Sequence, residues 1–355
     1  MICIRGLEII TPLEVFRDDI VIEDNKIKKI GSEICNEEIV NSNAKYVVPG
    51  FIDIHTHGIG EMIFNNIQSE KDFENIRQMF YSHGVTTFIP TTISEDIDKL
   101  LYVSKILYES KSIGIHLEGP FINPNRRGAH KVISKFDSKI LEISKLFNQK
   151  RITVAPEILS DSELEALANN FQVSIGHTDA DLEQGKRAIG LGASSVTHIF
   201  NAMRPFHHRD PGIIGLAFTS RLYTEVIPDL IHVSDIAVEL VSKVKGDRMI
   251  LVTDSLYTEK GVHRLYDEEI NCNNACFNKD GKLVGSSITL DEGVRRVSKI
   301  IGINEAIISA TYSPAKLLDL QLGEISRGFQ ADLVLLDGKL TVLTTIKNGK
   351  IVYSA

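Results

Sequence analysis

Five apolar segments of this sequence end in histidine or acidic side chains, where an enzyme would place metal ligands. His55 and His57 follow the run 47–54, and a β-strand puts residues two apart on the same face. The other runs end at Glu118, His177, His198 and Asp254. Imidazole nitrogens and carboxylate oxygens are suitable ligands for zinc, iron or manganese. The pattern therefore indicates a hydrolytic metal site.

These ligands could hold one metal, or two metals bridged by Glu118. Either arrangement lowers the pKa of a bound water from about 16 to about 7, which provides a nucleophile at neutral pH. Asp254 is best used to take the water proton and deliver it to a leaving nitrogen, although a strand-end Asp can also be a helix cap. Any single histidine could instead be a buried structural residue. We expect this for His116, which lies one layer deeper than Glu118.

Strands that alternate with helices are expected to position these residues. Between 47 and 321, buried-looking apolar runs alternate with stretches of helical periodicity, as in parallel βα units. The expected strands are 47–54, 85–91, 113–118, 151–156, 172–176, 194–199, 223–228 and 249–253, and the expected helices are 71–82, 95–109, 161–170, 235–245 and 289–301. Eight such units predict an α/β fold with a (β/α)8 TIM-type barrel, whose active site lies at the carboxyl ends of the strands.

Both ends of the chain show a different pattern, in which short β-rich segments alternate with turns, as in a small antiparallel sheet. Segments 19–23 and 26–31 form a hairpin through Asp24-Asn25, and Asn348-Gly349 is a strong signal for another hairpin. We therefore predict a small β-sandwich domain built from residues 1–46 and 322–355. The barrel would occupy residues 47–321.

The composition excludes several classes of partner. The chain has 355 residues, 43% of them hydrophobic, and a formal net charge of −8 with no concentrated Lys and Arg, so nucleic acid is not expected. It lacks a secretory signal and any run of 18 apolar residues, which predicts a cytoplasmic protein without membrane partners. Cys3, Cys35, Cys272 and Cys276 are expected to be reduced thiols. Cys272 and Cys276 could alternatively form half of a metal site, but no second pair lies nearby.

Short motifs run through nearly the whole chain. They are PGFIDIHTHG at 49–58, GVTT at 84–87, HLEGPF at 116–121, GAH at 128–130, APE at 155–157, GHT at 176–178, THIFNAM at 197–203, DPG at 210–212 and GKLVGSS at 281–287. Together they resemble the N-acetylglucosamine-6-phosphate deacetylases of the amidohydrolase superfamily. The resemblance implies hydrolysis of the acetamide of N-acetylglucosamine 6-phosphate to acetate and glucosamine 6-phosphate, in amino-sugar catabolism and recycling.

The resemblance also implies a role for each candidate residue. Glu118, His177 and His198 would hold the principal divalent metal, His55 and His57 a second one, and Asp254 would be the general base and acid. Implied substrate contacts are His130, a donor to the carbonyl oxygen or the sugar, then Asn201 and Ala202, and finally Arg209 and His232 as phosphate partners. An Arg matches phosphate oxygens with its planar fork. In relatives this Arg comes from the neighbouring subunit, so a homodimer is implied, whereas a solvated loop charge is the alternative for Arg209.

Some positions depart from the family pattern. The fourth strand ends in Ala155-Pro156-Glu157 without the modified Lys that bridges two metals in many members, which leaves Glu118 as the bridge. Ser255-Leu256-Tyr257 follow Asp254 where relatives usually have small residues, and Tyr257 would crowd the site. Ser234 replaces an Asp found in many relatives, and residues 271–282 form an insertion. These changes bear on acyl and sugar preference more than on the reaction class.

Two other functions compete with this interpretation. A cyclic-amide or nucleobase hydrolase could use the same barrel, but the missing Lys and the presence of His130, Arg209 and His232 favour a sugar phosphate. An inactive metabolite-binding or scaffolding protein is the third possibility. The complete set of ligands together with Asp254 argues against it, and it would be favoured by a purified protein without metal.

Overall fold

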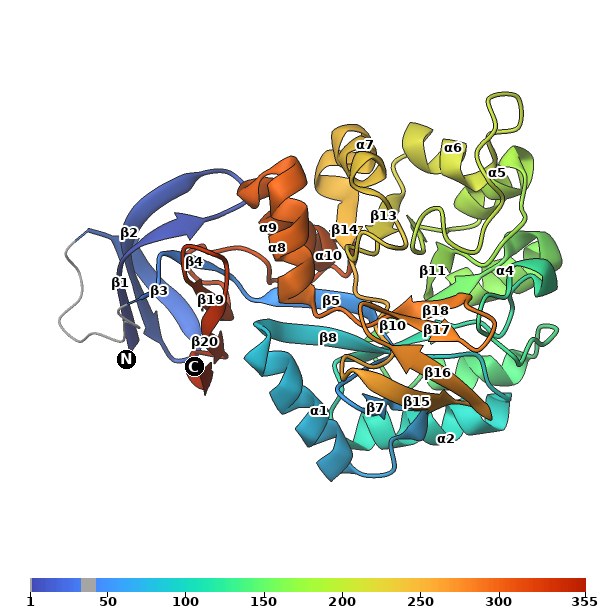
Figure 1. Cartoon of the computed structure of the whole chain (residues 1–355), viewed down its shortest axis with the longest axis horizontal. Coiled ribbons are helices and arrows are strands. Elements are labelled where there is room, and N and C mark those ends of the chain that lie inside the picture. Colours follow the sequence, from blue (N-terminus) through green and yellow to red (C-terminus); the bar gives the residue numbers. More distant parts are fainter. Residues whose placement is uncertain (1, 33–42) are drawn as a thin grey trace.

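The computed structural model describes residues 2–32 and 43–355. A parallel eight-stranded sheet forms the centre of its larger part (Figure 1). Its strands are hydrogen-bonded in chain order: β5 (Phe51–Thr56), β8 (Val85–Thr92), β9 (Gly114–Glu118), β10 (Gln149–Val154), β11 (Gln172–Ile175), β12 (Ser195–Val196), β13 (Tyr223–Val226) and β14 (Met249–Leu251). The prediction of eight parallel strands in a (β/α)8 barrel is confirmed.

The barrel is closed by hydrogen bonds between the first strand, β5, and the segment that follows the last strand, β14. The hydroxyl of Thr253 donates to Oδ2 of Asp53 at 2.6 Å, and the backbone N–H of Asp254 donates to the carbonyl of His55 at 2.9 Å. Burial raises the pKa of Asp53 to about 7, although the hydrogen bond from Thr253 opposes this rise. The end of β5 and the segment after β14 are thereby held side by side.

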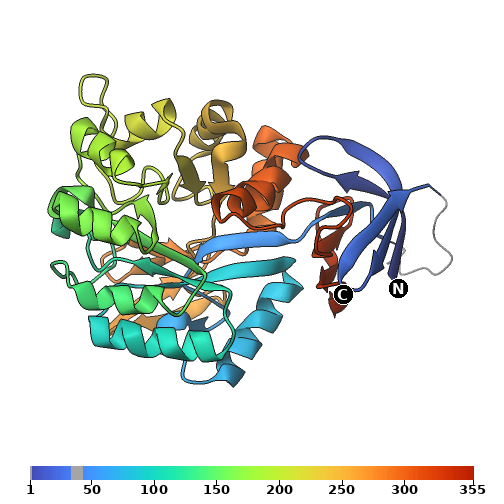
Figure 2. The same ribbon diagram turned by 180° about the vertical axis from the view of Figure 1, so that it is seen from behind.

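The helices surround the sheet, as Figures 1 and 2 show from opposite sides. They are α1 (Glu70–Ser82), α2 (Ile97–Glu109), α3 (Leu141–Ser144), α4 (Asp161–Ala168), α5 (Leu182–Gly190), α6 (Gly212–Thr219), α7 (Asp235–Lys245), α8 (Leu290–Ile301), α9 (Ile303–Ala310) and α10 (Tyr312–Leu317). α4 begins with the predicted capping box, in which Ser160 and Glu163 satisfy each other's backbone N–H groups. The five predicted helices are confirmed, with bounds that shift by up to two residues.

A second, seven-stranded sheet joins the two ends of the chain. Its order is β21 (Lys350–Ser354), β20 (Val342–Lys347), β19 (Leu333–Leu336), β4 (Tyr46–Pro49), β1 (Ile2–Ile10), β2 (Val15–Glu23) and β3 (Lys26–Gly31). An isolated antiparallel β-bridge joins Lys26 in β3 to Gln330, just before β19. The sheet encloses a core that includes Ile4, Ile20 and Leu333. This is the predicted small β-sandwich.

Both predicted hairpins form in this sandwich. The β2–β3 turn has positive φ at Asp24 (47°) and Asn25 (64°), and the β20–β21 turn has positive φ at Asn348 (51°) and Gly349 (69°). Two positive φ angles define the turn that matches the twist of paired strands. A Cβ on Gly349 would lie 3.0 Å from the Cα of Asn25. The backbones of the two turns are therefore packed against each other, and a side chain at position 349 would push them apart.

One predicted strand needs correction here. The run 47–54 is two strands rather than one, because β4 pairs with β1 and β19 while β5 begins the barrel. The predicted domain limit at residue 46 therefore falls at the start of β4, and the division into domains 1–46 with 322–355 and 47–321 stays a prediction. Met1 and residues 33–42, with Cys35, lie outside the described residues.

Smaller antiparallel sheets stand near the mouth of the barrel. One contains β15 (Gly261–Leu265), β16 (Glu268–Cys272), β17 (Ala275–Asn278) and β18 (Leu283–Ser286), and the other contains β6 (Gly58–Ile59) and β7 (Met62–Ile63). Cys272 and Cys276 form a disulfide across β16 and β17, and Cys3 is disulfide-bonded as well. The expectation of reduced thiols is wrong for these three residues, and the disulfide removes the alternative of a metal half-site.

Within the described ranges, no helix combines the length and the apolar character that crossing a membrane requires.

Candidate active site

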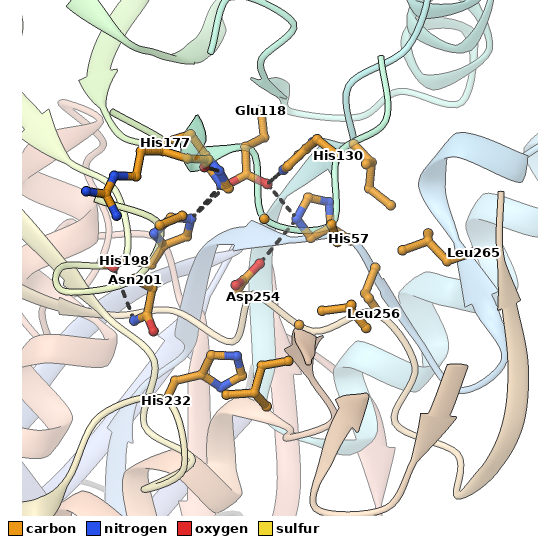
Figure 3. Close-up of a pocket in the computed structure, with 18 of the residues that line it drawn as sticks. His57, Glu118, His130, His177, His198, Asn201, His232, Asp254, Leu256 and Leu265 are labelled. Atoms are coloured by element: carbon orange, nitrogen blue, oxygen red, sulfur yellow. Dashed lines mark hydrogen bonds and ion pairs between the residues drawn. The ribbon is translucent and has the colours of Figure 1, made fainter. Parts of the chain in front are cut away.

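The predicted metal ligands meet where the barrel strands end, at one mouth of the barrel. Figure 3 shows them except for His55. His55 lies in β5 and Glu118 ends β9, whereas the others follow their strands by one to three residues: His57, His177, His198 and Asp254. All six residues are buried or nearly so. The convergence predicted from the sequence therefore occurs in the structure.

Left-handed backbone turns direct three of these side chains. The φ angles are 48° at His177, 27° at His198 and 47° at Asp254, a region that residues other than glycine rarely occupy. Gly176 also permits a close approach, because a Cβ there would lie 2.7 Å from the Cβ of Thr197. Such backbone conformations are costly and cluster at functional sites, which supports a functional reading of these strand ends.

Glu118 is the centre of the cluster. Its Oε1 lies 2.9 Å from Nε2 of His198 and 3.1 Å from Nε2 of His177. The same oxygen lies 3.4 Å from Nε2 of His55, while Oε2 lies 3.0 Å from Nε2 of His57. Glu118 is thus positioned to bridge two groups of histidines, as expected in the absence of a Lys on the fourth strand.

Asp254 closes the other side of the cluster. Its Oδ1 lies 3.2 Å from Nε2 of His57 and 3.4 Å from Nε2 of His55. Burial favours protonation of Asp254, but the hydrogen bond with His57 and the nearby His55 lower its pKa to about 2. Burial likewise opposes ionisation of Glu118, and the surrounding histidines lower its pKa well below the usual value. Both carboxyl groups are therefore ionised at neutral pH.

The hydrogen bonds behind three histidines show which nitrogen faces the cluster. Nδ1 of His57 lies 3.2 Å from the carbonyl of Thr91, and Nδ1 of His177 lies 2.8 Å from the carbonyl of Arg126. A carbonyl only accepts, so Nδ1 carries the proton and Nε2 presents a lone pair when the ring is neutral. Nδ1 of His55 similarly faces the carboxylate of Glu225 at 3.0 Å.

Several acceptors consequently face one another across a small buried volume. Nε2 of His55 makes no hydrogen bond among the described residues, although it is fully buried. Lone pairs and carboxylate oxygens at such short separations repel one another unless a metal ion or a proton lies between them. Burial opposes a charge on His55 and His57, but Glu118 and Asp254 raise the pKa of both rings, so the cluster favours positive charge at its centre. One ligand atom from each of His55, His57, Glu118 and Asp254 falls within 4.8 Å of the others. The donor set therefore fits a divalent metal.

His130 differs from the ligands although it also touches Glu118, at 3.1 Å from Nε2 to Oε2. Its Nδ1 accepts the backbone N–H of Ser94 at 3.1 Å, so the proton of the neutral ring lies on Nε2. Burial lowers the pKa of His130 to about 4, although Glu118 opposes this. His130 is thus a neutral hydrogen-bond donor that points into the site. Proximity alone would group it with metal ligands, but its tautomer argues against that role.

A pocket of about 300 Å³ opens above the cluster. Four predicted substrate contacts line it, namely His130, Asn201, Ala202 and His232, and Leu256 and Leu265 form an apolar wall on the side of His57 (Figure 3). Nδ2 of Asn201 donates to the carbonyls of His198 and Ile199, which leaves Oδ1 for other contacts. The pocket thus combines a polar wall, an apolar wall and the candidate metal cluster.

His232 carries a carboxylate partner on the side away from the pocket. Its Nδ1 lies 2.6 Å from Oδ2 of Asp229, whose Oδ1 accepts two backbone N–H groups. Burial disfavours the charged ring, but the bond to Asp229 raises the pKa of His232. His232 is therefore suited to an anionic group.

Arg209 does not enter the pocket of its own chain. It is exposed and lies beside His208, with 3.1 Å between Nη1 and Nε2. Arg126 was not predicted as a site residue. It lines the pocket, but its guanidinium is paired with Asp179 at 2.6 Å.

The departures from the family pattern have structural explanations. The hydroxyl of Tyr257 donates to the carbonyl of Arg264 at 2.6 Å, and its ring stacks on His263, so Tyr257 packs within the β15–β18 region rather than lining the pocket. Leu256 does line the pocket. Ser234 caps α7 through the N–H of Ala237.

His116 is held as a structural residue. Nε2 lies 2.8 Å from the hydroxyl of Thr153, and Nδ1 lies 3.3 Å from that of Thr91. Burial and the charge of Arg151 lower the pKa of His116 well below its ordinary value. These contacts agree with the structural role expected for it.

Comparison with known proteins identifies the relatives of this chain. The model of the amidohydrolase family matches residues 46–352. The N-acetylglucosamine-6-phosphate deacetylase of Lysinibacillus sphaericus is 32% identical, with 94% of this chain and 92% of the relative covered. The crystal structure of the Thermotoga maritima enzyme of that name is 32% identical, with a TM-score of 0.90 and full coverage of both chains. A mutant of the Mycobacterium smegmatis enzyme, in complex with N-acetyl-D-glucosamine-6-phosphate, is 26% identical, with a TM-score of 0.93 and 99% coverage of both chains.

Proposed function

The chain belongs to the amidohydrolase family, and we propose that it hydrolyses the acetamide of N-acetylglucosamine 6-phosphate to glucosamine 6-phosphate and acetate. One observation carries this proposal above the others: Nε2 of His55, His57 and His177 all face Glu118, and Nε2 of His55 and His57 also face Asp254, beside a pocket. The activity fits a role in amino-sugar catabolism and recycling.

The residues at the barrel mouth would hold one or two divalent metals. Glu118, His177 and His198 would bind the principal ion, and His55 and His57 would bind a second ion that Glu118 bridges. When bound, the metal lowers the pKa of a water molecule and supplies the nucleophile. Zinc, iron and manganese all suit this mixture of imidazole and carboxylate ligands.

Asp254 would move the proton. Its carboxylate is ionised at neutral pH, so it can accept the proton of the attacking water. It then delivers that proton to the nitrogen of the breaking C–N bond, so the amine leaves in neutral form. The acyl group leaves as acetic acid, which releases its remaining proton to become acetate. The same residue acts first as base and then as acid.

His130 and Asn201 would orient the acetamide and the sugar. The Nε2–H of His130 can donate to the carbonyl oxygen and stabilise the negative charge that develops there. Oδ1 of Asn201 and the backbone of Ala202 remain for contacts with the sugar.

The phosphate would bind at His232 and at Arg209 of a second copy of the chain. Arg209 lies on an exposed loop away from its own pocket, so its guanidinium is available to a neighbour. Exposed apolar side chains lie nearby in the sequence or on α7: Phe206, Leu230, Ile231, Ile236, Leu240 and Val244. An apolar stripe of this kind is typical of a subunit interface, which supports a homodimer.

The test is acetate release by the metal-reconstituted enzyme. We expect N-acetylglucosamine 6-phosphate to be hydrolysed with a kcat/KM at least about 10²-fold above that of N-acetylglucosamine, because loss of the phosphate leaves His232 and the neighbouring Arg209 without their anionic partner. Equal turnover of both sugars would contradict the phosphate assignment. Faster turnover of a cyclic amide would favour the alternative hydrolase. The cytoplasmic location is a separate proposal, which fractionation of the producing cells tests.

A further inference from the structure

Behind His55, inside the barrel, lies a buried ion pair that the proposed reaction does not use. Arg151 lies in β10 and Glu225 lies in β13, and both side chains are fully buried. Nη2 of Arg151 is 2.5 Å from Oε1 of Glu225. Burying two charges removes their hydration, and replacing such a pair by apolar residues is often neutral or stabilising. Stability alone is therefore a weak explanation for this pair.

The contacts of the pair lead to the metal cluster. Oε2 of Glu225 lies 3.0 Å from Nδ1 of His55. The guanidinium of Arg151 also donates to the carbonyl of Ile54 at 3.0 Å and to the hydroxyl of Ser195 at 3.2 Å. Arg151 thus connects β10 with β5, β12 and β13, and it holds the carboxylate of Glu225 against the back of the His55 ring.

This arrangement fixes the state of His55. Because the carboxylate of Glu225 only accepts, Nδ1 of His55 carries the proton of the neutral ring, and Nε2 then presents a lone pair to a metal. That Nε2 makes no hydrogen bond among the described residues and lies 3.4 Å from both Glu118 and Asp254. His57 and His177 obtain the same orientation from backbone carbonyls, whereas His55 relies on a side-chain carboxylate.

We propose that Glu225, held in place by Arg151, is a positioning residue that makes His55 a ligand of a second divalent metal. A carboxylate bonded to a ligating imidazole fixes its ring and raises its basicity. The chain would accordingly bind two metals, with Glu225 acting on the one at His55 and His57. This inference rests on the proposed function, but its test requires no substrate.

The test is Glu225→Gln in the full-length protein, stripped of metal and titrated with Zn²⁺ by calorimetry. Arg151 only donates, so the amide oxygen of the new side chain faces Arg151 and the amide NH₂ faces His55. Nδ1 then becomes an acceptor, the proton moves to Nε2, and the lone pair is lost. We expect two equivalents in the original protein, and in the variant one tight equivalent with the second weakened about 10- to 100-fold.

A matched control separates this effect from the loss of a buried ion pair. Asp291 is buried, is bonded to His83 and Arg295 and does not line the pocket, so Asp291→Asn should leave two equivalents with unchanged affinity. Arg151→Met combined with Glu225→Leu removes both charges at similar volume, and it should fold and lose the second site. Circular dichroism checks the fold of every variant.

A measurement on the original protein complements the variants. The ¹⁵N shifts of the Zn²⁺-loaded protein report which nitrogen of His55 carries the proton, assigned through the signals that disappear in His55→Gln, and we expect the proton on Nδ1. A proton on Nε2, a single equivalent in the original protein, or wild-type affinity for the second Zn²⁺ in folded Glu225→Gln would each overturn the proposal. Two-site binding without acetate release would instead contradict the proposed reaction and leave this inference standing.

Discussion

The backbone N–H of Ser94 donates to Nδ1 of His130 at 3.1 Å, which distinguishes this ring from the neighbouring histidines. The bond places the ring proton on Nε2, so His130 offers a donor to the pocket where His177 offers a lone pair. The carbonyl of Ser94 in turn accepts the hydroxyl of Tyr266 at 2.7 Å. Tyr266 thereby connects the β15–β16 turn to the proposed carbonyl-polarising residue.

Tyr266→Phe should therefore lower kcat. Loss of the hydroxyl frees the Ser94 peptide, the Nε2–H of His130 shifts relative to the carbonyl oxygen, and a displacement of this kind costs about 10-fold in rate. KM should change little, and steady-state acetate release measures both constants. Tyr257→Phe is the matched control, since that hydroxyl bonds Arg264 in the same region. An equal loss in both variants would point to general loosening of the small sheet.

Asp254→Asn should reduce kcat by about 10²- to 10⁴-fold, the usual contribution of a general acid–base group. The amide cannot accept the water proton at any pH, whereas the carboxyl group has a pKa of about 2 and is ionised at neutral pH. Acetate release measures the effect, and metal analysis of the same samples shows whether the ions remain. If a variant with full metal content kept wild-type activity, Asp254 would not be the proton carrier.

Much of the site could be predicted because its residues close apolar strands. The spacing of His55 and His57, and the strand ends at Glu118, His177 and His198, are visible in the sequence and converge through barrel topology alone. Arg151 and Glu225 carry no such signal. Each lies in a strand of mixed polar and apolar residues, and only the three-dimensional packing shows that they meet behind His55.

The parts of the fold that escaped prediction have physical causes. α6 (Gly212–Thr219) is apolar on nearly every face and contains two glycines, so it has no amphipathic period. β4 and β5 are both completely buried, so the run 47–54 shows no change of pattern where the chain passes from one sheet to the other. Spacing alone did not decide between thiols and a disulfide for Cys272 and Cys276, which face each other across a strand pair.

Removal of metal should abolish activity and lower the melting temperature. Without a cation, His55 and His57 can take up protons and pair with the carboxylates: burial opposes a charge on these rings, but Glu118 and Asp254 raise the pKa of both. The fold nevertheless loses the stabilisation that a bound ion supplies. An ion present at about 1,000 times its dissociation constant stabilises the fold by about 4 kcal/mol. Differential scanning calorimetry before and after chelation, followed by addition of Zn²⁺ or Mn²⁺, measures both changes. A metal-free protein with full activity would exclude the proposed chemistry.

Arg209 should act across a subunit boundary. Arg209→Ala and Asp254→Asn should each be nearly inactive as pure proteins. In an equal mixture with exchanged subunits, half of the dimers are hybrids with one complete site, so activity should recover to about a quarter of wild type. Arg204→Ala is the matched control, because Arg204 is paired with Asp179 and Asp210 of its own chain. Mixing it with Asp254→Asn should therefore produce no recovery of activity beyond that of the two separate proteins. Absence of recovery after proven exchange would place Arg209 outside the site.

Asp291 should make stability depend on pH. Burial favours its protonated form, but the hydrogen bond from His83 and the charge of Arg295 lower its pKa from 3.8 to about 2. A pKa that is lower in the folded state contributes stability above the unfolded value, and this contribution is lost as pH falls through the folded value. Asp291→Asn should thus lower the free energy of unfolding by about 2 kcal/mol at pH 7, with the difference shrinking between about pH 4 and pH 2.

Urea denaturation at several pH values measures this difference, and a neighbour on the same helix provides the control. Glu292 pairs with Arg296 at the surface of α8, so Glu292→Gln should change stability by less than about 1 kcal/mol at any pH. The contrast arises because Asp291 is 6% exposed, whereas the side chain of Glu292 is 42% exposed and its charge is screened by water. A difference for Asp291→Asn that stayed constant with pH would mean that packing, rather than ionisation, explains its contribution.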